Sequence, residues 1–398
     1  MKDIRVAYRL TAILLLLLAV LLGAFVLAGK RSVEAYVQEA VRECSSTEGS
    51  RSECYERTIV ALYPRLSVEE IFAVVREMRE LDPEYQFCHV LGHKLGEKAV
   101  ERDPARWLEV MPQNPPDGLC SNGFIHGVVG GRFRADVLDE ATLEKSIPDF
   151  SRACEPRENW APSPLDQAIC YHGMGHLYMF ITDADVPKAL SLCERTAEGN
   201  NPGRDFRTVC REGVFMQIYQ PLEPDDFLLI ERMPEKPTKE TVRQFCARYE
   251  RPEYVGACLR ESWPLFREEL FEGGEFAAFC SDQPNEAEET TCYMAAFTIF
   301  SRQSLEDPQK VLEVCSKAPT DRRGLCYFSG AQALLEEDRA EAWKAIDFCN
   351  AAPSPYARKC LEELLSTVQF NFASGTQGER DFCAVLPVDM QARCPSSE

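Results

Sequence analysis

Apolar stretches of helix length recur along the chain, and most of them either end or begin at a cysteine. Pro308–Cys315 and Ala342–Cys349 are apolar helical stretches that end at cysteine, and we call such a segment helix A. A longer apolar stretch opens at the following cysteine, as at Cys326, and we call it helix B. Asp307 before Pro308 supplies an N-cap and a proline at the first helical position. The pattern predicts antiparallel helix pairs joined by loops of about ten residues.

The helix pairs repeat with a fixed period. One set of cysteines advances in steps of 34 residues and a second set in steps of 34 or 35. The first set is Cys258, Cys292, Cys326, Cys360 and Cys394, and the second is Cys246, Cys280, Cys315, Cys349 and Cys383. A period in this range is typical of repeat architectures. One hairpin cannot bury its apolar stripe alone, so neighbouring hairpins must stack into a continuous core.

The cysteines predict a ladder of disulfides. An antiparallel hairpin brings the end of helix A beside the start of helix B, where two Cα atoms can approach to about 5.5 Å as a disulfide requires. The predicted pairs are Cys44–Cys54, Cys154–Cys170, Cys193–Cys210, Cys246–Cys258, Cys280–Cys292, Cys315–Cys326, Cys349–Cys360 and Cys383–Cys394. Each closed loop should contribute roughly 3 kcal/mol to stability.

Two cysteines depart from this rule. Cys88 and Cys120 both stand where a helix B should start, and the helix A positions that should hold their partners are Met78 and Met111. We predict that Cys88 and Cys120 pair with each other across neighbouring hairpins. The alternative is a pair of free thiolates that serve a metal ion.

The two-helix repeat of 34 residues resembles the tetratricopeptide class, and the disulfide in each hairpin is similar to the cysteine-rich Sel1-type proteins. The resemblance implies an all-α fold, a right-handed α-solenoid of about eight to nine hairpins with the B helices on one face. It covers residues 240–398 well and the rest loosely. The usual Trp, Gly, Tyr and Ala positions of those repeats are not matched, so a peptide-binding groove is not carried over. We divide the body into residues 32–240, with irregular repeats, and residues 241–398, with regular ones.

The N-terminal segment predicts a membrane anchor. An uncharged apolar run extends from Leu10 to Ala28 and is flanked by basic residues on both sides. We expect residues 10–29 to span the membrane once, with residues 1–9 as a short cytoplasmic tail. The alternative is a signal sequence cleaved after Ala28.

The cysteine count places the body of the chain outside the cytoplasm. Eighteen cysteines, an even number, are stable as disulfides in an oxidising compartment. We therefore predict a single-pass membrane protein whose bulk is periplasmic or at the cell surface.

The charge balance argues against nucleic acid as a partner. Asp and Glu together number 64 against 44 for Lys and Arg, a formal net charge of -20, and no basic run interleaves with aromatic residues. A strongly acidic chain repels a polyphosphate backbone.

All the histidines lie just after the helix B cysteines of three successive units. They are His89, His93, His126, His172 and His176. His89 with His93, and His172 with His176, are four residues apart, so each pair shares one face of a helix. Equivalent positions in stacked repeats should meet in one region. We predict that the five side chains bind a transition metal ion, and imidazole suits zinc, copper or iron.

Two carboxylates extend this pattern as candidate catalytic residues. Glu97 continues the face of His89 and His93 by one turn, and Glu212 stands in the register after Cys210 that His172 holds after Cys170. Either could act as an outer ligand or a general base. The plainer interpretation is that both are solvated helix residues and that the histidines are capped residues of the core.

Glycines cluster around the histidines: Gly92, Gly96, Gly123, Gly127, Gly173 and Gly175. Because glycine costs about 1 kcal/mol in a helix interior, this density indicates close backbone approach or space for a ligand. Tight helix packing alone is the simpler explanation.

Three functions remain open at this point. The first is a metal-dependent hydrolase, the second a non-catalytic metal-binding or metal-delivery protein, and the third a scaffold whose solenoid face binds a protein partner. The chain contains no GxSxG, P-loop, HExxH or dinucleotide fingerprint, so the sequence names no particular reaction. We favour metal binding.

Overall fold

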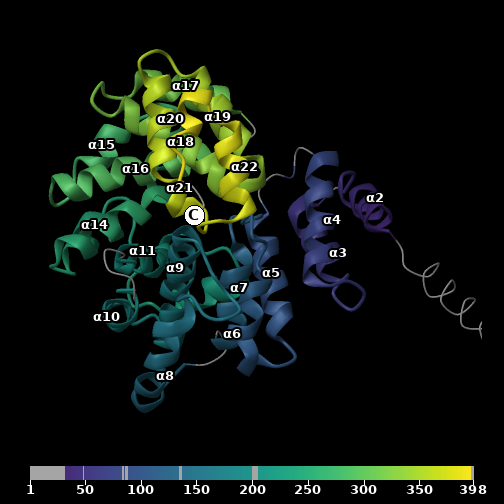
Figure 1. Ribbon diagram of the computed structural model, residues 1–398. Coiled ribbons are helices and arrows are strands. Elements are labelled where there is room, and N and C mark those ends of the chain that lie inside the picture. Colours follow the sequence, from purple (N-terminus) through teal and green to yellow (C-terminus); the bar gives the residue numbers. More distant parts are fainter. Residues whose placement is uncertain are drawn as a thin grey trace, which may run out of the picture. The chain divides into compact units, whose positions relative to one another are not determined.

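Helices build the described part of the chain (Figure 1). The computed structural model describes residues 32–47, 49–82, 85, 88–133, 137–199, 205–305 and 307–395. Over these residues the β structure is limited to an isolated bridge between Arg157 and Trp160. The predicted all-α class is confirmed.

The chain separates into two compact units, Met1–Pro83 and Glu84–Glu398. The described helices of the first unit are α2 (Val33–Cys44), α3 (Arg51–Val60) and α4 (Val68–Leu81). They pack on one another, and each begins at a serine whose hydroxyl accepts a hydrogen bond from a backbone N–H of the first turn.

The predicted membrane anchor at residues 10–29 lies outside the described residues. Among the helices that the structure does describe, none combines the length and the apolar character needed to cross a membrane.

The second unit is a series of helix pairs. Its B helices are α5 (His89–Val100), α7 (Gly123–Phe133), α9 (Pro164–Ile181), α11 (Arg207–Tyr219), α14 (Pro252–Glu261), α16 (Glu286–Arg302), α18 (Arg323–Glu337) and α20 (Tyr356–Ser366). Its A helices are α6 (Trp107–Val110), α8 (Glu140–Ala153), α10 (Val186–Thr196), α13 (Val242–Ala247), α15 (Phe276–Cys280), α17 (Pro308–Lys317), α19 (Ala342–Ala351) and α22 (Gln377–Val385). Short elements complete it: η1 (Pro104–Arg106), η2 (Met111–Gln113), α12 (Pro224–Glu231), η3 (Trp263–Phe266), η4 (Glu269–Gly273), η5 (Arg339–Glu341), α21 (Val368–Asn371) and α23 (Val388–Gln391).

The Asp-Pro dipeptides at 307–308 and 103–104 begin helical segments of different length. The Asp307 carboxylate accepts a hydrogen bond from the Lys310 N–H at 3.2 Å, and Pro308 occupies the first turn of α17, as predicted. Asp103 makes no side-chain cap bond within the described chain, and Pro104 opens only the short η1 turn. The same dipeptide therefore does not by itself determine the length of the helix that follows it.

All the predicted disulfides are present. Every cysteine is paired, and the pairs follow the order that the hairpin geometry indicates. Cys88 and Cys120 pair with each other at a Cα separation of 4.8 Å, which excludes the alternative of free thiolates. The covalent ladder is thus complete in both units.

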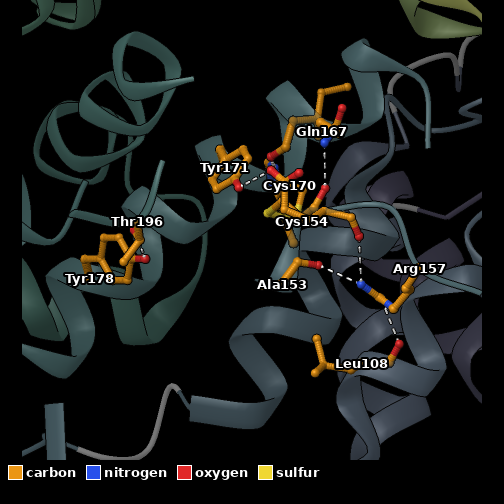
Figure 2. Close-up of a disulfide and its surroundings, with 12 residues drawn as sticks. Leu108, Ala153, Cys154, Arg157, Gln167, Cys170, Tyr171, Tyr178 and Thr196 are labelled. Carbon is orange, nitrogen blue, oxygen red and sulfur yellow. Dashed lines mark hydrogen bonds between the residues drawn. A yellow bond between two sulfur atoms is a disulfide. The ribbon is translucent and has the colours of Figure 1, made fainter. Parts of the chain in front are cut away.

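Figure 2 shows how one disulfide joins a hairpin, at Cys154–Cys170. Around it, the Gln167 amide donates to the Cys154 carbonyl at 3.2 Å. Arg157 donates to the carbonyls of Ala153 and Leu108 at 3.1 and 2.8 Å. The disulfide and the Gln167 bond hold the end of α8 against α9, the helix that carries two of the histidines, and Arg157 joins the end of α8 to α6.

The B helices of the second unit stack in chain order. Each of α5, α7, α9, α11, α14, α16, α18 and α20 contacts the next one in this series. The series then returns on itself, because α21 contacts α9 (Figure 1). The predicted stack of hairpins is present, and its curvature is large enough to bring the late repeats back to the early ones. The right-handed α-solenoid itself stays a prediction.

Arg339 is the main connection in this closing contact. Its side chain is 2% exposed and donates to Asp166 Oδ1 at 2.8 Å, to the Pro116 carbonyl at 3.0 Å and to Ser163 Oγ at 3.2 Å. Its backbone N–H donates to the Asp117 carbonyl at 3.0 Å. Ser163 and Asp166 form the capping box of α9, so Arg339 binds the start of a helix more than 170 residues earlier in the chain.

We expect Arg339→Ala to lower the free energy of unfolding by about 3 to 5 kcal/mol, because it leaves the Asp166 carboxylate, which is only 14% exposed, without its cation. Urea unfolding with the disulfides intact measures this change. Arg358→Ala is the matched control, since the Arg358 side chain is 60% exposed and its ion pairs with Glu362 and Asp389 lie in solvent. Equal losses in the two variants would contradict the closing role of Arg339.

Candidate metal centre

Backbone contact between α5 and α7 sets the positions of three histidines. A Cβ atom at Gly123 would lie 2.3 Å from the His89 carbonyl oxygen, and one at Gly127 would lie 2.0 Å from that of His93. A Cβ at Gly96 would lie 2.2 Å from the Phe124 carbonyl oxygen. Real Cβ atoms do not approach oxygen this closely, so only glycine permits the contact.

The same arrangement recurs between α9 and α11. A Cβ atom at Gly175 would lie 2.1 Å from the Cys210 carbonyl oxygen, and one at Gly213 would lie 2.0 Å from the His172 carbonyl oxygen. The glycines near the histidines therefore serve tight helix packing. That packing brings the imidazole rings of neighbouring helices within contact distance.

Backbone carbonyls fix the ring orientation of three histidines. His89 Nδ1–H donates to the Cys120 carbonyl at 3.2 Å, and His172 Nδ1–H donates to the Val209 carbonyl at 3.1 Å. These two bonds are equivalent in the two helix pairs. His126 is turned the other way, since its Nε2–H donates to the Ile169 carbonyl at 2.8 Å. A carbonyl can only accept, so the second nitrogen of each neutral ring carries the lone pair.

Glu223, at the start of α12, orients His93. His93 Nδ1–H donates to Glu223 Oε1 at 3.1 Å, and Lys94 Nζ donates to Glu223 Oε2 at 2.7 Å. The Glu223 side chain is only 4% exposed. A buried carboxylate on the far nitrogen of an imidazole is the usual outer partner of a metal-binding histidine, because it fixes the ring and makes its other nitrogen more basic.

Three lone pairs converge between α5 and α7. His89 Nε2 and His93 Nε2 are 3.1 Å apart, and one ring nitrogen from each of His89, His93 and His126 lies within 4.8 Å of the others. His126 Nδ1 is buried and has no hydrogen-bond partner among the described residues. Facing lone pairs repel unless a cation lies between them, so this group could bind a metal ion.

Burial favours the neutral form of the His89, His126 and His172 rings. It lowers the pKa of His89, His126 and His172 well below the ordinary value of 6.5, and the neighbouring histidines lower it further. Neutral imidazole is the form that binds metals, so no proton has to be removed first near neutral pH.

The other histidine pair adjoins the group of three. The ring of His126 is 5.8 Å from that of His172 and 5.9 Å from that of His176, between centroids. His176 Nδ1–H donates to Gln217 Oε1 at 2.8 Å. The structure thus brings all five predicted histidines into one continuous cluster, although only His89, His93 and His126 form a compact three-nitrogen group within the described chain.

A small cavity of about 30 Å³ borders the cluster. Besides His89, His93, His126 and His176, its lining includes Phe180, Met216, Gln217, Gln220 and Asp226. This volume accommodates one or two water molecules. A ligand of that size could occupy an open coordination position.

Neither of the two predicted catalytic carboxylates belongs to the compact three-nitrogen group among the described residues. Glu97 is on α5, where its backbone adjoins Gly131 of α7, and it does not line the cavity within the described residues. Glu212 accepts two hydrogen bonds from Arg260, at 2.9 and 3.1 Å. A catalytic role for either stays a prediction. Sequence reasoning missed Glu223, whose only sequence signal is its place before Pro224 at a helix start.

A buried charged network adjoins this region. Arg260, 1% exposed, lies between Glu212 and Glu288, and the Gln220 amide donates to Glu261 Oε2 at 2.8 Å. Burial, together with the nearby Glu212 carboxylate, raises the pKa of Glu261 to about 8. Gln220 therefore lies between the protonated Glu261 carboxyl group and the cavity beside the histidines.

Comparisons of this chain with family models, with curated proteins and with solved structures find no match. The site is therefore interpreted from its own geometry.

We expect Gly127→Ala to lower the free energy of unfolding by about 2 kcal/mol or more, because the added methyl group would overlap the His93 carbonyl and separate α5 from α7. Gly324→Ala is the matched control within a helix. Its Cβ would lie 3.3 Å from the mobile end of Lys359, so we expect no loss or a gain of up to about 1 kcal/mol. Urea unfolding of both variants tests the contact, and similar values for the two would contradict it.

Glu261 predicts a pH dependence of stability. The folded state holds the proton up to about pH 8, whereas the unfolded carboxyl group loses it near 4.5. The unfolded state therefore binds fewer protons in this window, and the free energy of unfolding falls as pH rises through it. We expect Glu261→Gln to reduce this fall by on the order of 1 kcal/mol or more between pH 5 and 8. Glu109→Gln, at an exposed site, is the control. If the free energy of unfolding depends on pH in the same way in Glu261→Gln and in the native protein, Glu261 is not the group responsible.

Proposed function

We propose that this protein holds a transition metal ion at His89, His93 and His126, with its folded body in an oxidising extracytoplasmic compartment. The observation that carries the proposal is the convergence of three imidazole nitrogens whose partner nitrogens already donate elsewhere. His89 donates to a carbonyl, His93 to the Glu223 carboxylate and His126 to a carbonyl. A metal-free core would gain nothing from three lone pairs directed at one another.

The surroundings of the group suit a preformed metal site. The glycine contacts between α5 and α7 leave the helices little freedom to separate, and the disulfide Cys88–Cys120 joins the starts of the same two helices. A ligand set held in place before the ion arrives loses little conformational entropy on binding.

Three protein ligands leave the coordination sphere open. Zinc sites with three protein nitrogens keep a position for water, and copper and iron accept the same ligands. The cavity of about 30 Å³ would admit water or another very small molecule at that position. We therefore propose metal binding as the function. A hydrolase for a larger substrate would require this cavity to widen.

The compartment follows from the covalent chemistry. Nine disulfides are stable only where thiols are oxidised. We propose that residues 10–29 anchor the chain in the membrane and that the repeats lie on the extracytoplasmic side. A protein partner on the stacked helices is the alternative function, and in that case the histidines would only fill the interior.

We expect the native protein to contain about one equivalent of zinc, copper or iron, and His126→Ala to lose it. We expect Glu223→Gln to weaken metal affinity by roughly 10- to 100-fold, because the amide supports the His93 ring less well than a carboxylate. Elemental analysis after purification and after dialysis against a chelator measures both effects.

Glu109→Gln is the control for Glu223→Gln, since Glu109 pairs only with the exposed Arg106 in the described chain. Full metal content in Glu109→Gln and a loss in the other two variants supports the proposal. Less than a tenth of an equivalent of any transition metal in the native protein, unchanged after reconstitution, would favour the scaffold.

A further inference from the structure

Met216 of α11 lies against the second histidine pair. Its Sδ atom is 3.2 Å from His172 Nε2, and its side chain lines the same cavity as His176. His172 and His176 are one turn apart on α9, with ring centroids 4.9 Å apart. A thioether and two imidazoles from adjacent helices therefore gather beside the group of three histidines.

The contact between His172 and Met216 is not an ordinary hydrogen bond. His172 uses its Nδ1 proton to bond the Val209 carbonyl at 3.1 Å, so Nε2 carries the lone pair of a neutral ring. A thioether sulfur has no proton to donate. Two electron-pair donors thus face each other at 3.2 Å, as His89 Nε2 and His93 Nε2 do at 3.1 Å in the equivalent helix pair.

The second ring of the pair is oriented in the same way. His176 Nδ1–H donates to Gln217 Oε1 at 2.8 Å, which assigns the lone pair of His176 to Nε2. Gln217 follows Met216 directly in α11, so one helix supplies both the sulfur atom and the group that orients the ring. The tight contact between Gly175, Gly213 and their neighbours holds α9 and α11 together.

We propose that His172, His176 and Met216 form a second metal site, separate from the first and selective for Cu(I). Thioether sulfur is a soft ligand that favours Cu(I), whereas zinc and ferrous ions gain little from it. The first site offers nitrogen ligands only. The two sites share no ligand, and the ring of His126 lies between them.

This second site does not rest on the proposed function, because its ligands lie on α9 and α11 whereas those of the first site lie on α5 and α7. The protein would then hold two ions of different softness side by side. At the second site the protein would bind a soft monovalent metal cation. Copper would enter and leave this site as Cu(I), so no redox step is needed.

The test measures Cu(I) affinity of the purified full-length chain under anaerobic conditions, by competition with a chromogenic Cu(I) chelator. Met216→Leu removes the sulfur and keeps the side-chain volume, so the fold should survive. We expect this variant to lower the Cu(I) affinity at least tenfold. Loss of a group that only supports a metal ligand already costs about tenfold, and Met216 is proposed as a ligand itself. Met179→Leu is the matched control, since Met179 is fully buried on α9 and we expect its variant to bind Cu(I) as the native protein does.

His126→Ala separates this proposal from the first one. We expect that variant to lose the ion of the first site, whether zinc, copper or iron, and to keep Cu(I) at the second site, with a sulfur neighbour visible in the X-ray absorption spectrum of copper. Unchanged Cu(I) affinity in Met216→Leu, or loss of Cu(I) binding in His126→Ala, would overturn the second site. Cu(I) binding that depends on Met216, together with no zinc, copper or iron whose binding depends on His126, would refute the first site and leave the second standing.

Discussion

Direct contact between the backbones of neighbouring B helices is the constraint on which the candidate metal centre depends. Glycine at positions 123 and 127 lets α7 approach the carbonyls of His89 and His93, and Gly213 does the same for α11 at His172. Helices with ordinary side chains at their contact lie about 8 to 10 Å apart, and the glycines allow α5 and α7 a closer backbone approach that sets where the histidine rings lie. The helix propensity lost at each glycine, about 1 kcal/mol, is offset by the packing that it permits.

Two kinds of connection hold this arrangement in place. The disulfides act locally, since each of them except Cys88–Cys120 joins the two helices of one hairpin. Arg339 acts over a long range by binding the capping box of α9. The Cys88–Cys120 bond differs from the rest because it joins two B helices, and these are the two that supply the three-histidine group.

The interior of the second unit contains two kinds of polar chemistry. Around the histidines, burial lowers the pKa of the rings, so they stay neutral and keep their lone pairs. Around Arg260, the same burial is compensated by two carboxylates that form ion pairs with the guanidinium group. Gln220 lies at the boundary, since it lines the cavity and donates to the protonated Glu261. The cavity is therefore bordered by imidazole rings and side-chain amides together with the Asp226 carboxyl group, a lining that suits a cation better than an anion.

The sequence by itself determined the helical class, the disulfide pairs and the histidines that would meet. These depend on local spacing: the repeat fixes where a helix ends, and a hairpin fixes which cysteines are neighbours, including Cys88 and Cys120 as the remaining pair. The position of residues within the repeat also points to Glu97 and Glu212, but it cannot show which carboxylate contacts a histidine ring. Only the tertiary structure decided that Glu223, 130 residues after His93, is the partner and that Met216 lies on His172. Such contacts depend on the path of a connecting loop and on the closure of the stack, and neither has a periodic signal in the chain.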